Sequence, residues 1–254
     1  MGMMKSTLRI LIAAAICAVP SSVAYAQCTA AVTDGLIGYW RMDDTSGNTI
    51  VDSSGTGNTG TWYDDTDNAI TTESVSGQVG TALDLENGDN SYILVDTDAS
   101  ISNTTRSVCL WINPESSLSN YKSLVDKADA SDNGWNLYYN GSGQRVGWYT
   151  NYGGYIELAN GTMPVGVWQH YCGTWDGSDG VSGMALYKDG QLATPNSSGD
   201  VGGYTSDAGN QLYIGGSIAD SGNGFDGIMD QVMLFNRELS AAEVQAIYEG
   251  QVAA

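Results

Sequence analysis

The chain has 254 residues, of which 29 are acidic and 9 basic, giving a formal net charge of −20. A surface this acidic repels phosphate backbones and anionic membranes, so the composition argues against nucleic acid as a partner. No apolar stretch is long enough to span a bilayer, and the length suits one domain with a sizeable core.

The first 26 residues have the pattern of a secretory signal peptide. Lys5 and Arg9 supply the positive start, residues 10–18 form a short apolar core, and Ala24-Tyr25-Ala26 fits an A-x-A cleavage site. Residues 27–35 follow as a short lead-in segment, and residues 36–254 read as a single domain. This organisation predicts a secreted protein, either extracellular or periplasmic.

From residue 36 onward, short apolar or alternating runs are separated by clusters of Gly, Asn, Asp and Ser, which is typical of strands joined by turns. Asp189-Gly190 is a two-residue hairpin signal. We predict strands at 36–42, 82–85, 92–95, 107–113, 123–127, 135–139, 146–150, 156–159, 168–175, 184–188, 211–215 and 225–235. Many strands with short turns predict an all-β fold, a two-sheet sandwich.

One short helix is predicted near the C-terminus. Ser240 and Glu243 have the spacing of a capping box, in which each side chain bonds a free amide of the first turn. Val244 and Ile247 then follow helical spacing, and Gly250 can end the helix. We expect its apolar stripe to pack on the sandwich.

Several different short sequence blocks follow one another in a fixed order along the chain. They include G-L-I-G-Y-W-R-M-D-D at 35–44, V-D-S-S-G-T-G-N-T-G at 51–60, S-V-C-L-W-I-N-P at 107–114, V-W-Q-H-Y-C-G-T-W-D-G at 167–177, L-Y-I-G-G at 212–216 and F-D-G-I-M-D-Q-V-M-L-F at 225–235. In this order and spacing the blocks closely resemble the bacterial LamG-like jellyroll domains of the concanavalin A-like lectin/glucanase group, which has laminin G and pentraxin relatives. The resemblance implies that the two-sheet sandwich is an antiparallel jelly-roll with a binding role toward glycans or proteins, while the fold alone does not decide the ligand.

Three cysteines follow the signal peptide. The resemblance implies a disulfide between Cys109 and Cys172, because pentraxins join the cysteines of these two strands, and export permits the bond. Cys28 is left over near the start of the mature chain, where we expect it to be exposed and able to pair between chains.

Loops rich in Asp, Asn and Gly offer the oxygen ligands that calcium prefers, so we expect Ca²⁺ as a cofactor. The resemblance implies a pentraxin-like loop site in which Asp132 and Asn133 precede one strand and Asp220 follows the L-Y-I-G-G block. The sequence departs from that family beside Asp220, where Ile218 and Ala219 replace a Glu-Gln pair.

An alternative structural calcium site is closer to the bacterial LamG-like domains. It would combine Asp43, Asp52, Asn58 and Asp230 where the first and last strands meet. Asp52 and Asn58 can instead shape a turn through local hydrogen bonds between side chain and backbone.

The third signal is a cluster of aromatic residues around a turn. Trp148, Tyr149, Tyr152 and Tyr155 combine apolar faces with polar edges, onto which sugars stack, and we predict that they bind the ligand. Because strand side chains alternate, one of Trp148 and Tyr149 should lie in the core.

Catalysis is not expected. His170 is the only histidine, no G-x-S-x-G motif is present, and the E-x-D-x-x-E carboxylates of glucanases with this fold are missing. Asp84 and Glu86 do place two acids on one strand face. The sequence therefore predicts a secreted, non-catalytic module that binds a glycan or an extracellular protein, assisted by calcium. The alternatives are a glycoside hydrolase or lyase on the same fold, and a structural or adhesive component of an extracellular assembly.

Overall fold

The computed structural model describes residues 32–64, 70, 73–86, 91–96, 101–102, 105–117, 120–129, 131, 133–150, 154–199, 206–216 and 224–250. The predicted signal peptide and Cys28 lie outside the described residues. So do three predicted site residues, Asp132, Tyr152 and Asp220.

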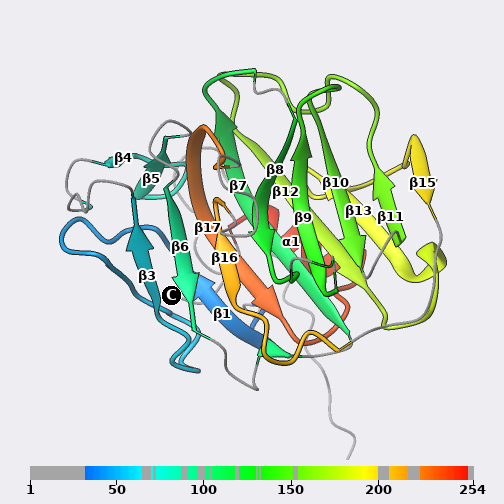
Figure 1. Ribbon diagram of the computed structural model, residues 1–254, viewed down its shortest axis with the longest axis horizontal. Helices are drawn as coiled ribbons and strands as arrows, with labels where there is room; N and C mark the ends of the chain where they lie inside the picture. The colour runs from blue at the N-terminus through cyan, green and yellow to red at the C-terminus, as the bar shows by residue number, and fades with distance from the viewer. Residues whose placement is uncertain are drawn as a thin grey trace, which may run out of the picture.

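Within the described residues the strands form two antiparallel sheets (Figure 1). One sheet has eight strands in the order β14 (Gln191–Ala193), β13 (Met184–Lys188), β12 (Gln169–Trp175), β7 (Arg106–Pro114), β17 (Gly227–Phe235), β5 (Thr81–Leu85) and β4 (Ser74–Ser76), with β1 (Leu36–Trp40) also paired to β17. The other has nine, in the order β15 (Ser197–Gly199), β11 (Gly154–Glu157), β10 (Arg145–Thr150), β9 (Trp135–Asn140), β8 (Tyr121–Asp126), β16 (Leu212–Ile214), β6 (Tyr92–Val95), β3 (Gly60–Tyr63) and β2 (Thr49–Ile50). The predicted all-β, two-sheet sandwich is confirmed.

The core lies between the two sheets, and strand alternation fills it. Trp40, Trp135, Trp148, Tyr139 and Phe225 are among the largest fully buried side chains. Each large apolar side chain removed from water stabilises the fold by about 1.5–3 kcal/mol. Alternate positions on the same strands point outward and are available to form a surface site.

The outer face of the eight-stranded sheet is covered in part by the helix α1 (Ala241–Tyr248). The predicted capping box is confirmed, since the Ser240 hydroxyl accepts from the Glu243 amide and the Glu243 carboxylate accepts from the Ser240 amide. Val244 and Ile247 pack into a second apolar cluster. No helix in the described part of the chain has the length and hydropathy needed to cross a membrane.

Two further local predictions are confirmed. Cys109 and Cys172 lie directly opposite each other in the ladder between β7 and β12 and form a disulfide bond. Asp189 and Gly190 form the turn between β13 and β14, both with positive φ (50° and 77°), as a tight hairpin requires.

Candidate functional site

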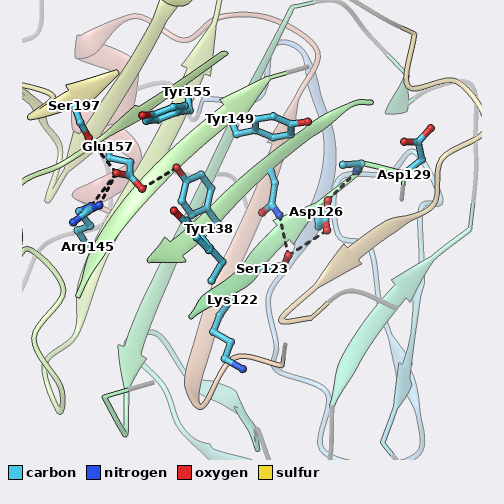
Figure 2. Close-up of a pocket in the computed structure, with 13 residues that line it drawn as sticks. Lys122, Ser123, Asp126, Asp129, Tyr138, Arg145, Tyr149, Tyr155, Glu157 and Ser197 are labelled. Atoms are coloured by element: carbon cyan, nitrogen blue, oxygen red, sulfur yellow. Dashed lines mark hydrogen bonds and ion pairs between the residues drawn. The ribbon is translucent and has the colours of Figure 1, made fainter. Parts of the chain in front are cut away.

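A groove with a volume of about 670 Å³ lies on the outer face of the nine-stranded sheet, over β8–β11 and β15 (Figure 2). Its lining combines aromatic and polar side chains. The tyrosines are Tyr121, Tyr138, Tyr149 and Tyr155, and the polar residues include Asp126, Asp129, Asn136, Arg145, Glu157 and Ser197.

Two of the four residues predicted to bind the ligand lie in this groove. Tyr149 and Tyr155 are direct cross-strand partners in the ladder between β10 and β11, and both point outward into the groove. Trp148 is fully buried instead, and its indole nitrogen donates to the carbonyl of Thr174 at 3.1 Å. The prediction of a ligand role for Trp148 is therefore wrong, because alternation along β10 turns it toward the core.

The groove floor is formed by Tyr138, which lies on the strand before the four residues predicted to bind the ligand. It lies opposite Gly147 in the ladder between β9 and β10, and a Cβ at position 147 would overlap the Tyr138 ring. The ring of Tyr121, which is 58 % exposed, lies 5.5 Å from that of Tyr138. Glycine at position 147 thus lets an aromatic ring lie low across the sheet.

A buried carboxylate, Glu157, holds this part of the groove together. It accepts hydrogen bonds from Asn140 Nδ2 at 2.7 Å, Ser197 Oγ at 3.1 Å and Tyr138 Oη at 3.1 Å, and it forms an ion pair with Arg145 at 2.8 Å. Burial alone would raise the pKa of Glu157, but these hydrogen bonds outweigh it and hold the pKa below its ordinary value. Glu157 therefore stays ionised and fully engaged.

Asp126 and Asp129 add two carboxylates to the groove wall. Asp126 accepts from the amide of Ala128 at 2.8 Å and from the Ser123 hydroxyl at 3.2 Å. Asp129 accepts hydrogen bonds from the side chain of Asn133 and from the backbone amides of Asn133 and Ser131. Together these hydrogen bonds hold the pKa of Asp129 below its usual range. Asn133, a predicted calcium ligand, shapes this loop through its amide nitrogens, and its role as a calcium ligand stays a prediction.

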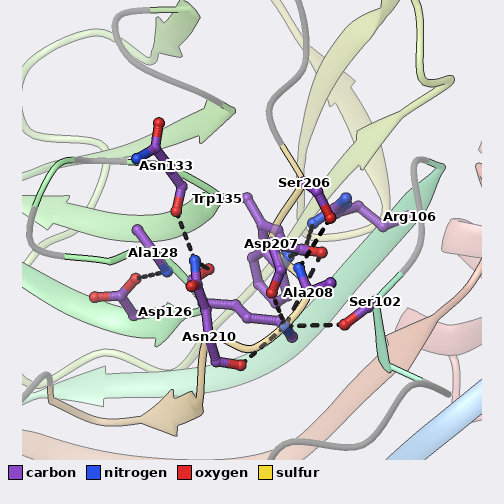
Figure 3. Close-up of polar contacts among 11 residues, drawn as sticks. Ser102, Arg106, Asp126, Ala128, Asn133, Trp135, Ser206, Asp207, Ala208 and Asn210 are labelled. Carbon is purple, nitrogen blue, oxygen red and sulfur yellow. Dashed lines mark hydrogen bonds and ion pairs between the residues drawn. The ribbon is translucent and has the colours of Figure 1, made fainter.

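A buried ionic cluster fixes that loop from beneath (Figure 3). Asp207 pairs with Arg106 at 2.6 Å, lies 4.0 Å from the ammonium of Lys127 and accepts from the Trp135 indole at 2.9 Å. The Asn210 amide donates to the carbonyls of Lys127 and Asn133. The segment around Asp207 thus anchors the 127–133 loop on which Asp129 stands.

The four residues of the alternative calcium site lie in two turns, and their role as calcium ligands stays a prediction. Asp52 accepts from the backbone amides of Tyr39, Ser54 and Asn58 at 2.8–2.9 Å. Burial would raise its pKa, but hydrogen bonds, first from Ser54, lower it. Asn58 donates to the carbonyl of Ile37 at 2.6 Å. Asp52 and Asn58 therefore shape a turn through hydrogen bonds to the backbone, which is the alternative to a metal site that the sequence left open.

The other two members of that site hold a different turn. Asp43 accepts from the amide of Thr81 at 2.9 Å, and Asp230 accepts from the amide of Val79 at 2.8 Å. Asp230 is fully buried, and burial is the main cause that raises its pKa to about 6. One oxygen of each carboxylate therefore accepts a backbone amide in the 79–81 turn.

In the described part of the chain, one trio of acidic side chains has oxygens within 4.8 Å of one another: Asp84, Glu86 and Glu115. Burial first, and then the neighbouring Glu115, raise the pKa of Asp84 to about 6. The Oδ1 atom of Asp84 is buried without a hydrogen-bond partner. The spacing of Asp84 and Glu86 was visible in the sequence, but the approach of Glu115, from the end of β7, was not.

Comparison with solved structures places the fold among binding and enzyme domains. Domain 4 of AbnA, an extracellular arabinanase from Geobacillus stearothermophilus, in complex with arabinotriose, is 19 % identical with a TM-score of 0.58, covering 84 % of this chain and 98 % of that one. The receptor-binding domain of botulinum neurotoxin serotype C/D is 19 % identical with a TM-score of 0.63, covering 87 % of this chain and 52 % of that one. Trypanosoma rangeli sialidase with sialic acid is 16 % identical with a TM-score of 0.62, covering 85 % and 33 %.

The chain thus spans about half of the toxin domain and a third of the sialidase. Comparison with curated protein sequences finds no match. A laminin G family model, described as the concanavalin A-like lectin/glucanases superfamily, matches residues 87–245, more than half of the chain. The predicted family is therefore confirmed, and the chain belongs to the concanavalin A-like lectin/glucanase superfamily.

Proposed function

We propose that the protein is a secreted, non-catalytic module that binds a glycan in the groove of the nine-stranded sheet. The observation that carries the proposal is the pair Tyr149 and Tyr155, which face the groove side by side above the floor residue Tyr138. Tyrosine rings offer sugars an apolar face, and the amide of Asn136 and the hydroxyl of Ser197 offer hydrogen bonds nearby.

The structural neighbours are consistent with a carbohydrate ligand. One was solved with arabinotriose and another with sialic acid, and the neurotoxin neighbour is a receptor-binding domain. At 16–19 % identity these similarities concern the fold, so the proposal of a glycan ligand depends on the residues of this chain's own groove.

The state of the groove carboxylates supports a binding role over hydrolysis. Glycoside hydrolysis needs a carboxylate pair flanking the bond, with a raised pKa on the acid. Glu157 has a lowered pKa and is paired with Arg145, and both oxygens of Asp126 accept hydrogen bonds from the protein. Neither carboxylate is poised to donate a proton.

Export is part of the same proposal. The N-terminal pattern of residues 1–26 is that of a signal peptide, and the disulfide between Cys109 and Cys172 suits an oxidising compartment. Cell fractionation with an antibody against the mature chain tests this, since retention in the cytosol would contradict it.

We also propose that calcium stabilises the fold, with Asp84, Glu86 and Glu115 as its carboxylate ligands. A divalent ion would satisfy the buried oxygen of Asp84 and offset the repulsion among the three acids. Millimolar calcium should raise the melting temperature relative to chelator, and Asp84→Asn should abolish that rise. Equal melting temperatures in calcium and chelator would exclude this role.

The binding proposal is tested by affinity electrophoresis in gels containing soluble polysaccharides. The panel should include arabinan, xylan, glucomannan and mixed-linkage β-glucan, with reducing-end release measured in parallel. We expect retardation by at least one polysaccharide, loss of it in Tyr149→Ala and Tyr155→Ala, and no release of reducing ends. Tyr248→Ala, which changes a tyrosine at the other sheet, is the matched control. No retardation on any gel, or release by the wild-type chain, would overturn the proposal.

A further inference from the structure

A second group of tyrosines lies on the same outer face, beyond the groove. Tyr63 on β3 stacks on Tyr92 of β6 at a centroid distance of 5.4 Å, and Tyr92 meets the edge of Tyr213 on β16 at 5.8 Å. Their sequence neighbours Trp62, Ile93 and Ile214 are buried in the core, so alternation turns the three tyrosines outward.

The strand register connects this group to the groove. Tyr213 pairs with Asp126, Asp126 with Asn136, Asn136 with Tyr149, and Tyr149 with Tyr155. These five residues therefore form one row that crosses β16, β8, β9, β10 and β11 at right angles to the strands. Figure 1 shows β16, β6 and β3 continuing the sheet beside β8.

The row continues from Tyr213 through Leu94 on β6 to Thr61 on β3, and Tyr92 and Tyr63 lie two residues along these strands from it. The row and the second tyrosine group together are long enough for several sugar residues. Neighbouring strands are about 4.8 Å apart, so Tyr155 on β11 and Tyr63 on β3, six strands along, are separated by about 29 Å across the sheet. Tyr63 is 39 % exposed, whereas Tyr213 is 5 % exposed and supports the stack from below.

The charges along the row favour an uncharged ligand. Asp126 and Asp129 lie between the two tyrosine groups. The guanidinium of Arg145 is engaged by Glu157 and Asn160, and Lys122 is buried opposite Tyr139, with its ammonium pointing away from Tyr149 and Tyr155 in Figure 2. Among the described residues along the row, an anionic sugar would meet carboxylates and no available cation.

We propose that Tyr63, Tyr92 and Tyr213 form a second glycan subsite, so that the sheet binds an extended, uncharged polysaccharide chain lying across its strands. The inference rests on the proposed function, because the groove supplies the first subsite. Two subsites on one polymer make the second contact intramolecular, so affinity should rise with chain length.

The test compares trimers with octamers of the polysaccharide that the gels identify, titrated calorimetrically. We expect the wild-type chain to bind the octamer about tenfold or more tightly than the trimer. Tyr63→Ala and Tyr92→Ala should remove this gain and leave trimer affinity unchanged, whereas Tyr149→Ala should weaken both. Equal affinities for trimer and octamer, or a gain that survives in Tyr63→Ala and Tyr92→Ala, would overturn the second subsite while the groove stands.

The remaining outcomes separate the two proposals. If octamer affinity depends on Tyr63 and Tyr92 but not on Tyr149 and Tyr155, the groove proposal fails and the second subsite stands. If neither length binds, both fail.

Carboxymethyl cellulose and hydroxyethyl cellulose provide a charged and an uncharged version of one backbone, and preferential retention of the charged form would overturn the ligand class. Melting curves of each variant confirm folding.

Discussion

Tyr138 lies across the backbone of Gly147, its direct partner in the ladder between β9 and β10. The same ring is fixed at its hydroxyl by Glu157, which is paired with Arg145. One glycine and one buried ion pair thus set the depth of the groove floor.

Gly147→Ala should weaken glycan binding about tenfold, because the new methyl group must displace the Tyr138 ring. Overpacking should also lower the free energy of unfolding by about 1–3 kcal/mol. Calorimetric titration and denaturant melts measure the two effects. In a Tyr138→Ala background the binding effect of Gly147→Ala should largely vanish, and an undiminished effect would contradict the link between these residues.

Trp148 and Tyr149 are adjacent but should respond to alanine in opposite ways. Trp148→Ala removes a fully buried indole and should lower the free energy of unfolding by about 3–5 kcal/mol. Tyr149→Ala should leave stability within about 1 kcal/mol and reduce glycan affinity. Urea unfolding and glycan titration of both variants separate the roles, and a stable Trp148→Ala chain with lost binding would reverse them.

Asp207→Asn should destabilise the fold by about 3–5 kcal/mol, because it leaves the buried charges of Arg106 and Lys127 without their counter-ion. Loosening of the 127–133 loop should follow, since Asn210 next to Asp207 ties that loop down. Hydrogen exchange at the amides of Ser131 and Asn133 reports this. Asp189→Asn, at the remote hairpin, is the control, and equal exchange in both variants would argue against the anchoring role.

His170 should make the fold sensitive to acid. Its side chain is fully buried against Trp111 and Tyr248, with Asp189 bonded to its backbone amide, and burial lowers its pKa from 6.5 to about 3. Since the unfolded chain binds the proton more readily, the stabilising contribution is complete above pH 6.5 and is lost as the pH falls toward 3. His170→Phe should remove about 2 kcal/mol of the loss between pH 7.5 and 5. Identical pH profiles for both chains would refute this.

The disulfide closes an interval of 63 residues and should contribute about 4 kcal/mol on a chain-entropy estimate. Cys109→Ser combined with Cys172→Ser should lower the free energy of unfolding by roughly that amount. Urea melts with and without reductant measure it: reductant should destabilise the wild-type chain and leave the double variant unchanged. A wild-type chain indifferent to reductant would speak against the bond.

Local patterns in the sequence predicted the longer strands and the C-terminal helix, but not the short strands β2, β3, β4, β14 and β15. The Asp189-Gly190 hairpin and the Ser240–Glu243 capping box depend on neighbours in sequence, and both occur as predicted. Alternation was also enough to predict that Trp148 and Tyr149 would part, although not which of them would face the core.

The site depends on pairing between distant strands, which single-sequence patterns do not reveal. Glu157 lies two residues after Tyr155 on β11, and Arg145 lies two residues before Gly147 and four before Tyr149 on β10. Residues at these spacings share one face of a strand, so the sequence could have shown that Glu157 and Arg145 point outward. Their mutual ion pair follows only from the register of β10 and β11. The residues next to Asp207 in the sequence indicate only an acidic residue in a loop. Its burial results from a contact with Arg106, which is 101 residues away in the sequence.

The central claim is that the glycan lies on the nine-stranded sheet, and NMR of tyrosine ring signals tests it most directly. Titration with the oligosaccharide should shift the signals of Tyr121, Tyr149 and Tyr155 in the groove and leave those of Tyr39, Tyr187 and Tyr248, which belong to the other sheet and its helix, unchanged. Shifts confined to Tyr39, Tyr187 and Tyr248 would contradict the account.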